Sequence, residues 1–134
     1  MSKFLKKMNK LASLALPQIN QHINSTFNER KASSARKNFG EWQAITALVD
    51  GTHIPVKVDS DVKGEHSWHS FKLKCDAVNQ LVGTDFDFII FYISPSHPAG
   101  THNDQELWNM YGDEYMAKLT PEDASVADGP FQRL

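Results

Sequence analysis

The spacing of apolar residues changes near residue 44, and this change constrains the fold more than any other feature of the chain. Before it, over residues 4–16, apolar residues recur at the i, i+3, i+4, i+7 spacing of an amphipathic helix. Pro17 ends this predicted helix, because the residue before a proline avoids the α region. After residue 44, apolar residues alternate with polar ones or form short unbroken runs, which is typical of strands.

The second part of the chain predicts a mixed α/β sheet. We expect a buried strand at residues 45–49, an extended segment at 53–58, a half-exposed strand at 71–76, a turn at 76–80 and a return strand from residue 81. Residues 86–93 are nearly all apolar, which predicts a central strand covered on both faces. We also expect this strand to neighbour 45–49, because the candidate acids that follow the two strands have to meet. Thr101 or Asn103 can cap a following helix, and residues 125–127 form a last short strand.

Residues 1–38 are predicted to be a basic helical arm and linker, followed by one domain at residues 39–134. A second, weaker helix is expected at 18–29, and the polar segment 30–38 indicates a surface linker. Residues 1–39 carry a net charge of +7 and residues 40–134 a net charge of −9. The basic residues of the arm are Lys3, Lys6, Lys7, Lys10, Arg30, Lys31, Arg36 and Lys37. They indicate either a segment that faces a polyanion such as DNA or an ordinary solvated helix.

Composition excludes several classes of protein. The length of 134 residues and the hydrophobic share of 40% are enough for one buried core. A single cysteine excludes an internal disulfide framework and a four-cysteine zinc site. The longest apolar run, residues 88–93, is far shorter than the roughly 18 residues of a membrane helix, so no membrane span is predicted. The arm has no acid before Glu29, as in mitochondrial targeting sequences, but its first turns use Lys where such sequences prefer Arg and Ser.

Three acidic residues follow predicted strands at similar places: Asp50, Asp104 and Asp128. Ligands of open α/β sheets bind beyond the carboxyl ends of the strands. Carboxylates gathered there suit Mg²⁺ or Mn²⁺, and two such ions about 3.5–4 Å apart activate water for phosphodiester cleavage. Asp is also frequent at strand ends and helix starts for structural reasons, so spacing alone leaves both interpretations open.

The residues around these acids are more specific than their spacing. The first block is ALVDGTHIPV at residues 47–56, with Phe39 and Trp42 before it. The second comprises KGEHS at 63–67, KLKCD at 72–76 and NQL at 79–81. The third is PAGTHND at 98–104, continuing to LWN at 107–109, and the fourth is VADG at 126–129. In this order the blocks resemble the DDE superfamily endonucleases, which comprise Harbinger-type transposases and the host nucleases derived from them.

The resemblance covers about residues 39–130 and implies a fold, an activity and a location. The implied fold is an α/β, RNase H-like mixed sheet with flanking helices. The implied activity is divalent-metal-dependent DNA cleavage, with Asp50 and Asp104 as catalytic acids and with Asp50, Asp104 and Asp128 on the metal side. The cofactor would be Mg²⁺ or Mn²⁺ and the partner DNA. Because 39 upstream residues are too few for the family's DNA-binding domain, a separate DNA-binding partner protein is a further expectation. The implied location is the nucleus.

Two departures from the family pattern favour an alternative. Asn103 separates His102 from Asp104, where the family has His followed directly by Asp; at a helix start one extra residue turns a side chain by about 100°. The family's final catalytic Glu lies on a helix beyond the last strand, whereas this chain stops at Leu134. We therefore expect a partial, C-terminally truncated domain. The alternative is a catalytically inactive, truncated or domesticated fragment that acts as a DNA- or protein-binding module, in the nucleus or the cytoplasm.

Histidine, cysteine and tryptophan residues offer weaker signals. His66 and His69, and His97 and His102, have spacings that zinc sites can use, but neither pair matches a known motif, which favours ordinary hydrogen-bonded histidines. The alternating pattern around Cys75 predicts a buried structural thiol. Three tryptophans, Trp42, Trp68 and Trp108, are able to stack on nucleobases, although their spacing is more typical of core residues.

Overall fold

The computed structural model describes residues 25–59 and 67–128, together with residues 3, 6–8, 10, 11 and 13–15. Its elements, in chain order, are α2 (Phe27–Lys37), a 3-10 helix η1 (Gly40–Ala44), β1 (Ala47–Pro55), β2 (His69–Ser70), β3 (Cys75–Thr84), β4 (Ile90–Ile93), β5 (His97–Pro98), α3 (Asp104–Met116) and β6 (Ser125–Ala127). The expected α/β class with a mixed sheet is confirmed. The described residues of the predicted helix at 4–16 are helical, and Met8, Leu11 and Leu14 are exposed there.

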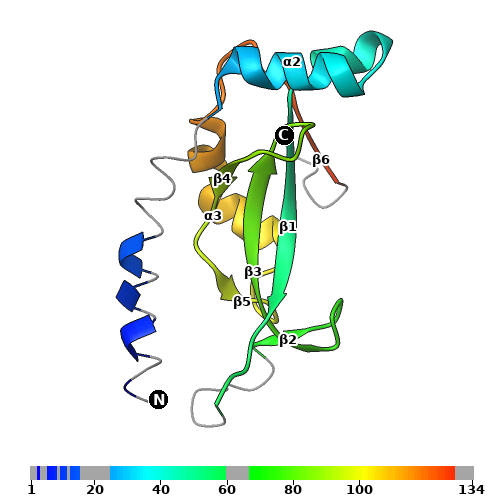
Figure 1. Ribbon diagram of the computed structural model, residues 1–134. Coiled ribbons are helices and arrows are strands. Elements are labelled where there is room, and N and C mark those ends of the chain that lie inside the picture. Colours follow the sequence, from blue (N-terminus) through cyan, green and yellow to red (C-terminus); the bar gives the residue numbers. More distant parts are fainter. Residues whose placement is uncertain are drawn as a thin grey trace.

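One sheet contains the described strands, and β3 is its centre (Figure 1). β1 pairs antiparallel with β3 from Leu48 opposite Thr84 to Pro55 opposite Ala77. On the other edge of β3, β4 pairs antiparallel with Val82–Thr84 and β5 with Val78 and Asn79, and β2 pairs with the beginning of β3. After α3, the chain returns to place β6 parallel to β1, with Ala47 beside Ser125 and Val49 beside Ala127. The spatial order of the long antiparallel strands and the parallel edge strand is therefore β4, β3, β1, β6.

The two faces of the sheet differ because successive side chains of a strand point to opposite faces. On β1 and β3, the buried positions alternate with more exposed ones and face α3. In Figure 1, α3 lies behind the sheet, and no described helix lies in front of it. The core consists of Ala47, Val49, Leu81, Phe91, Tyr92, Leu107 and Tyr115. We call the other face, which carries Leu48, Asp50 and Val82, the open face.

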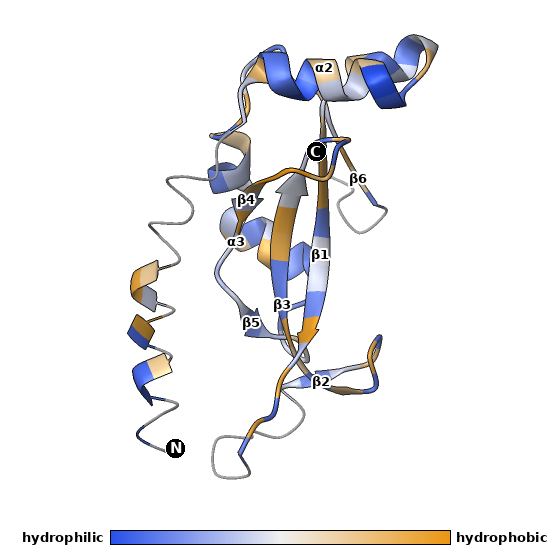
Figure 2. Cartoon of the chain, in the orientation of Figure 1, coloured by the Kyte–Doolittle hydropathy of each residue, from blue (hydrophilic) through white to orange (hydrophobic). Residues whose placement is uncertain are grey.

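Several expectations for individual elements were wrong. Residues 30–38 are not a linker: they belong mostly to α2, which Thr26 starts with a capping box to Glu29. Figure 2 shows why the pattern was weak, since α2 is largely hydrophilic whereas β4 is hydrophobic. The part of the predicted helix at 18–29 that precedes residue 25 lies outside the described residues.

The strand boundaries also differ from the prediction. β1 is one strand that continues through Asp50 and Gly51, where two shorter segments were expected. β3 starts at Cys75 and runs through the predicted turn at 76–80, while residues 71–74 form the turn. β4 is shorter than the predicted strand at 86–93, because the Asp85 carboxylate accepts the N–H groups of Asp87 and Ile89 and closes a turn.

The segments 45–49 and 86–93 were predicted to be neighbouring strands of one sheet, and only the shared sheet is correct. Both segments contribute to the same sheet, and neither is helical. They are not adjacent, because β3 lies between β1 and β4. β4 is also not a central strand: among the described residues it pairs with β3 alone.

A buried ion pair joins α2 to the segment just before β6. Arg30 of α2 and Asp123, just before β6, have side chains that are 1% and 0% exposed. Arg30 Nε donates to Asp123 Oδ1 at 2.9 Å, and the guanidinium lies 5.2 Å from the centre of the Phe91 ring. The Thr46 hydroxyl donates to the same carboxylate at 2.6 Å, and the Thr120 N–H donates to its other oxygen at 2.8 Å. The ion pair thus connects α2, β4, the residue before β1 and the segment that leads into β6.

We expect Asp123→Asn to lower the free energy of unfolding by about 3–5 kcal/mol, because it leaves the buried Arg30 guanidinium without its counter-charge. Denaturant unfolding followed by circular dichroism measures this loss. The matched control is Asp87→Asn, which removes the exposed ion pair with Arg36 on the same helix and should leave the midpoint nearly unchanged. Similar losses in the two variants would contradict the role assigned to the buried pair.

The same carboxylate predicts a pH dependence. Burial alone would raise the pKa of Asp123, but hydrogen bonds from Arg30, Thr46 and Thr120, together with the Arg30 charge, outweigh it and lower this pKa from 3.8 to about 2. A lowered folded-state pKa stabilises the protein above the unfolded value, and the stabilisation is lost as the pH falls from about 4 to about 2. The unfolding free energy should decrease over this window by about 2 kcal/mol more in the wild type than in Asp123→Asn.

Candidate functional site: two acids on neighbouring parallel strands

Asp50 and Asp128 come together where β1 and β6 run side by side. The register ends with Val49 beside Ala127, so Asp50 in β1 lies level with Asp128, the residue that follows β6. Neighbouring residues at the same level of two parallel strands point to the same face of the sheet. A cavity of about 380 Å³ is lined by Leu48, Val49, Asp50, Val126, Ala127 and Asp128. Two of the three acids predicted from the sequence therefore line one surface hollow.

Local backbone contacts fix the direction of the Asp50 side chain. Asp50 is exposed on the open face, and its Oδ1 accepts the N–H of Gly51 at 2.8 Å. This bond leaves the second oxygen of the carboxylate to face solvent or a ligand. Two carboxylates on adjacent strands repel each other in the absence of a cation, and carboxylate oxygens are the ligands that Mg²⁺ and Mn²⁺ prefer. The donor set of this hollow therefore suits a divalent cation.

Asp104 lies on the opposite face of the sheet. Asn103 caps α3, since its side-chain oxygen accepts the Glu106 N–H at 2.9 Å, and Asp104 is the first residue of the helix. The Asp104 carboxylate rests on Gly51, where a Cβ atom would come within 1.9 Å of Oδ1. Because Gly51 and Asp50 are consecutive in β1, their side-chain directions are opposite. The structure thus separates Asp104 from Asp50, and Asn103 occupies the cap position.

A buried asparagine holds Asp104 in this place. Asn79 of β3 is fully buried, and its Nδ2 donates to Asp104 Oδ1 at 2.8 Å and to the His102 carbonyl at 3.0 Å. This amide therefore ties the loop before α3 to the centre of the sheet. Among the residues that the structure describes, no three His, Cys, Asp or Glu side chains form a group that could hold a metal ion. A metal role for Asp104 stays a prediction.

The basic arm is partly occupied within the protein. Arg30 is buried against Asp123, and Arg36 pairs with Asp87. Arg30 is therefore not available for DNA phosphates, contrary to the expectation for the whole basic cluster. The lysines at positions 3, 6, 7 and 10 are exposed on the N-terminal helix. Any phosphate contacts of the arm must come mainly from these lysines and from α2 residues other than Arg30.

The histidines and the cysteine also have clear positions. His97 stacks on His102 with ring centres 4.6 Å apart, and its Nε2 is 2.5 Å from the Tyr111 hydroxyl oxygen. Burial, and then the charge of His102, lower the pKa of His97. The pair is thus hydrogen-bonded and stacked, as the simpler interpretation of the sequence expected. Cys75 is exposed, so the prediction of a buried thiol was wrong. His66 lies outside the described residues.

Sequence reasoning missed the two polar residues that organise the surroundings of the site, Asn79 and Asp123. A signal for Asn79 was present: it occupies an inward position in the alternating pattern Ala77, Asn79, Leu81, which is apolar on either side. The alternation was missed because a turn, and not a strand, was predicted at residues 76–80. Asp123 carries no comparable local signal, because its partner Arg30 lies 93 residues away.

Comparison of the chain with protein-family models, curated proteins and solved structures finds no match. The function proposed below therefore rests on the geometry of the described residues and on the motifs of the sequence.

The contact between Gly51 and Asp104 predicts a specific coupling. Gly51→Ala should destabilise the protein by about 1–3 kcal/mol, because the new methyl group displaces the Asp104 carboxylate from Asn79. In the Gly51→Ala background, Asp104→Ala should cost much less than it costs in the wild type, or should even restore stability. Denaturant unfolding of the four proteins in this double-mutant cycle measures the coupling. Additive losses would show that the two residues are not in contact.

Proposed function

We propose that residues 39–128 belong to an RNase H-like, divalent-metal-dependent DNA endonuclease domain in which Asp50 and Asp128 are the metal-side acids. The observation that carries the proposal is the position of these two carboxylates, at the same level of adjacent parallel strands and beside one hollow. The sequence motifs support it independently, because the first and the last block of the resemblance supply these two acids.

The topology also supports an RNase H-like assignment. Three antiparallel strands in the order β1, β3, β4 are followed by α3, and then by β6 on the other side of β1 and parallel to it. In this arrangement β1 lies between β3 and β6, and β6, the strand after the helix, is its parallel neighbour. An acid in the first strand and an acid at the end of that neighbour are therefore brought together by the order of the strands.

In the proposed reaction the chain positions the phosphodiester, and the carboxylates of Asp50 and Asp128 hold the positively charged cation. A divalent cation bound at such a site acidifies a water and stabilises the leaving oxygen of the cleaved bond. Asp50 and Asp128 would hold the cation through the oxygens that face the hollow. None of the described residues that line this hollow is basic. Further ligands would have to come from water, from the substrate or from residues outside the described part of the chain.

The substrate, partners and location follow the resemblance. We propose double-stranded DNA as the substrate, a separate DNA-binding protein as the partner and the nucleus as the location. The exposed lysines of the N-terminal helix are consistent with contacts to phosphate groups. None of the described helices is long and apolar enough to cross a membrane.

A second candidate is a module that binds DNA or protein but has no catalytic turnover. The observation in its favour is the position of Asp104, which is held by Asn79 on the face away from Asp50. Of the three acids predicted from the sequence, Asp50 and Asp128 therefore lie at the open face and Asp104 does not. The two candidates agree on cation binding at Asp50 and Asp128 and differ on cleavage.

We expect millimolar Mn²⁺ to raise the melting temperature of the wild-type chain, because a cation relieves the repulsion between Asp50 and Asp128. At ten times the dissociation constant the stabilisation is about 1.4 kcal/mol, or a few degrees. Asp50→Asn and Asp128→Asn should each remove most of this rise. Differential scanning fluorimetry with and without Mn²⁺ measures it.

The matched control for this experiment is Asp104→Asn, whose melting temperature should still rise with Mn²⁺ because its carboxylate lies on the other face. Loss of the Mn²⁺ response in Asp104→Asn alone would move the cation site to the α3 face. The absence of a response in the wild type would contradict the proposed metal centre. Nicking of supercoiled DNA that depends on Asp50 and Asp128 separates the nuclease from the binding module, which would show the Mn²⁺ response without nicking.

A further inference from the structure

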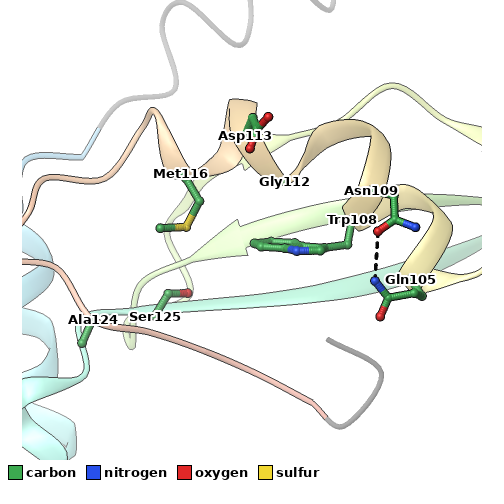
Figure 3. A pocket seen from close by; sticks show the side chains of 8 residues that line it. All are labelled: Gln105, Trp108, Asn109, Gly112, Asp113, Met116, Ala124 and Ser125. Atoms are coloured by element: carbon green, nitrogen blue, oxygen red, sulfur yellow. Dashed lines mark hydrogen bonds between the residues drawn. The ribbon is translucent and has the colours of Figure 1, made fainter. Parts of the chain in front are cut away.

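The aromatic side chains of the protein differ in how far the fold covers them. Trp108 is half-buried, beside a cavity of about 670 Å³ between α3 and the segment that leads into β6 (Figure 3). Phe71, in contrast, is 74% exposed in the turn between β2 and β3, where its ring lies edge-on to His69 at 5.1 Å between ring centres. Single exposed rings are common on protein surfaces, so the backbone and the neighbours of Phe71 decide what this one does.

A buried serine fixes the turn that carries Phe71. Ser70 is 1% exposed, its hydroxyl accepts the N–H of Leu73 at 3.1 Å, and its carbonyl accepts the N–H of Lys74 at 2.8 Å. The same hydroxyl lies 2.6 Å from Nδ1 of His53 in β1. Each of the residues 71–74 is exposed, but their backbone is tied to the sheet. We call these four residues the hairpin tip.

Lys74 has a backbone conformation that does not suit a lysine. Its φ is 59°, in the left-handed region where glycine is the usual residue. A non-glycine residue in this region costs stability, and residues held in such conformations cluster at functional sites. The hairpin tip therefore presents a cationic side chain at a position where the backbone alone favours glycine.

The charge near Phe71 distinguishes it from the exposed rings of Trp42 and Phe88. Each of those two residues directly follows an acidic residue in the sequence. The segment of residues 68–75 contains no acid, and two of the four residues of the hairpin tip are exposed lysines. A ring among cations suits a polyanion that also offers apolar surface.

Duplex DNA offers both contacts that the hairpin tip can make. Its phosphates bind lysines, and proteins that open a base step insert an apolar side chain, phenylalanine among others, between the bases. An anionic membrane also attracts lysines, but stable attachment to a membrane takes more than the small apolar surface of Phe71 and Leu73. The hairpin tip therefore favours DNA.

The hairpin also lies where a duplex bound at the open face can reach it. In Figure 1 it projects from the end of the sheet opposite to α2. On β3, Cys75 at the base of the hairpin and Val82 opposite Asp50 are seven residues apart. This separation is roughly 23 Å at about 3.3 Å per residue. A duplex spans it with about seven base pairs, at about 3.4 Å per pair.

We propose that the hairpin tip binds duplex DNA, with Phe71 wedged into one base step and with Lys72 and Lys74 on the phosphates beside it. The inference rests on the proposed function, because it takes duplex DNA as the partner. It does not involve the cation, since the hairpin tip and the hollow beside Asp50 lie at different places on the sheet.

The fluorescence of 2-aminopurine tests the wedge, because this base becomes brighter when its step is unstacked. The full-length chain is titrated in EDTA into a duplex that carries 2-aminopurine at TA steps, which open easily. We expect the fluorescence to rise as the wild type binds. Phe71→Ala should abolish the rise and weaken binding at least about fivefold, as expected for the loss of one contact between a base and an aromatic ring.

The matched control is Phe88→Ala, at a phenylalanine that is 79% exposed in another turn and also has a positive φ, of 62°. Because Phe88 follows an acid and has no role in the proposal, this variant should retain both the affinity and the rise in fluorescence. An equal loss in Phe71→Ala and Phe88→Ala would contradict a specific wedge.

Lys74→Gly separates the contact of the lysine with DNA from its effect on the fold. Glycine relieves the left-handed backbone, so this variant should melt at the wild-type temperature or above it while it binds duplex DNA more weakly. Lys74→Gly and Lys72→Gln should each reduce the slope of log affinity against log salt by about 0.9, the value of one phosphate contact. Unchanged slopes would overturn the assignment of the two lysines.

The remaining outcomes separate this proposal from the metal centre. DNA binding without a rise in fluorescence, an unaffected Phe71→Ala variant, or cosedimentation with phosphatidylserine vesicles that depends on Phe71 would each overturn the wedge. No binding to the duplex would overturn the wedge and the DNA partner together. The rise of the melting temperature with Mn²⁺ should be the same in Phe71→Ala as in the wild type, so the wedge and the metal centre fail separately.

Discussion

The Arg30–Asp123 ion pair is the interaction on which the arrangement of the elements depends. It is almost completely buried, and each of its members also bonds to a neighbouring segment: Arg30 to the Ser25 carbonyl, and Asp123 to Thr46 and Thr120. The residues after Asp123 form β6, whose three residues alone would be a weak addition to the sheet. Because Asp123 is fixed two residues before Ser125, β6 enters the sheet at a defined register, and that register decides where Asp128 lies.

The sequence was informative wherever a single segment determined the outcome. The α/β class, the cap at Asn103, the helix that follows it and the strand at 125–127 were predicted from local patterns and are confirmed. The prediction was wrong where contacts between residues far apart in the sequence determine the structure. α2 is hydrophilic because its inward residues are Arg30, Ser33 and Ser34, so a helix was mistaken for a linker. β3 includes the inward polar residue Asn79, and this residue made a strand look like a turn.

The candidate site shows the same division. Asp50 and Asp128 were predicted as metal-side acids from the sequence, whereas the parallel pairing of β1 with β6, which brings them to the same level, was not predicted. The place of Asp104 was not predictable from its spacing, because it depends on two residues in other strands. Gly51 leaves room for its carboxylate, and Asn79 supplies the donor that holds it. Asn103 caps α3, while these two contacts with the sheet set the position of the Asp104 carboxylate.

The parallel pairing of β1 with β6 has a consequence for how the protein is made. β1 is synthesised early, but its partner strand begins 78 residues after it, at Ser125 beside Ala47. Contacts between such distant residues form late in folding, because a long loop must close first. A nascent chain therefore carries Asp50 on an unfinished sheet edge until residues 125–127 have been synthesised. The pair of acids is assembled only when β6 has docked, so cation binding at this edge would report the docking of β6.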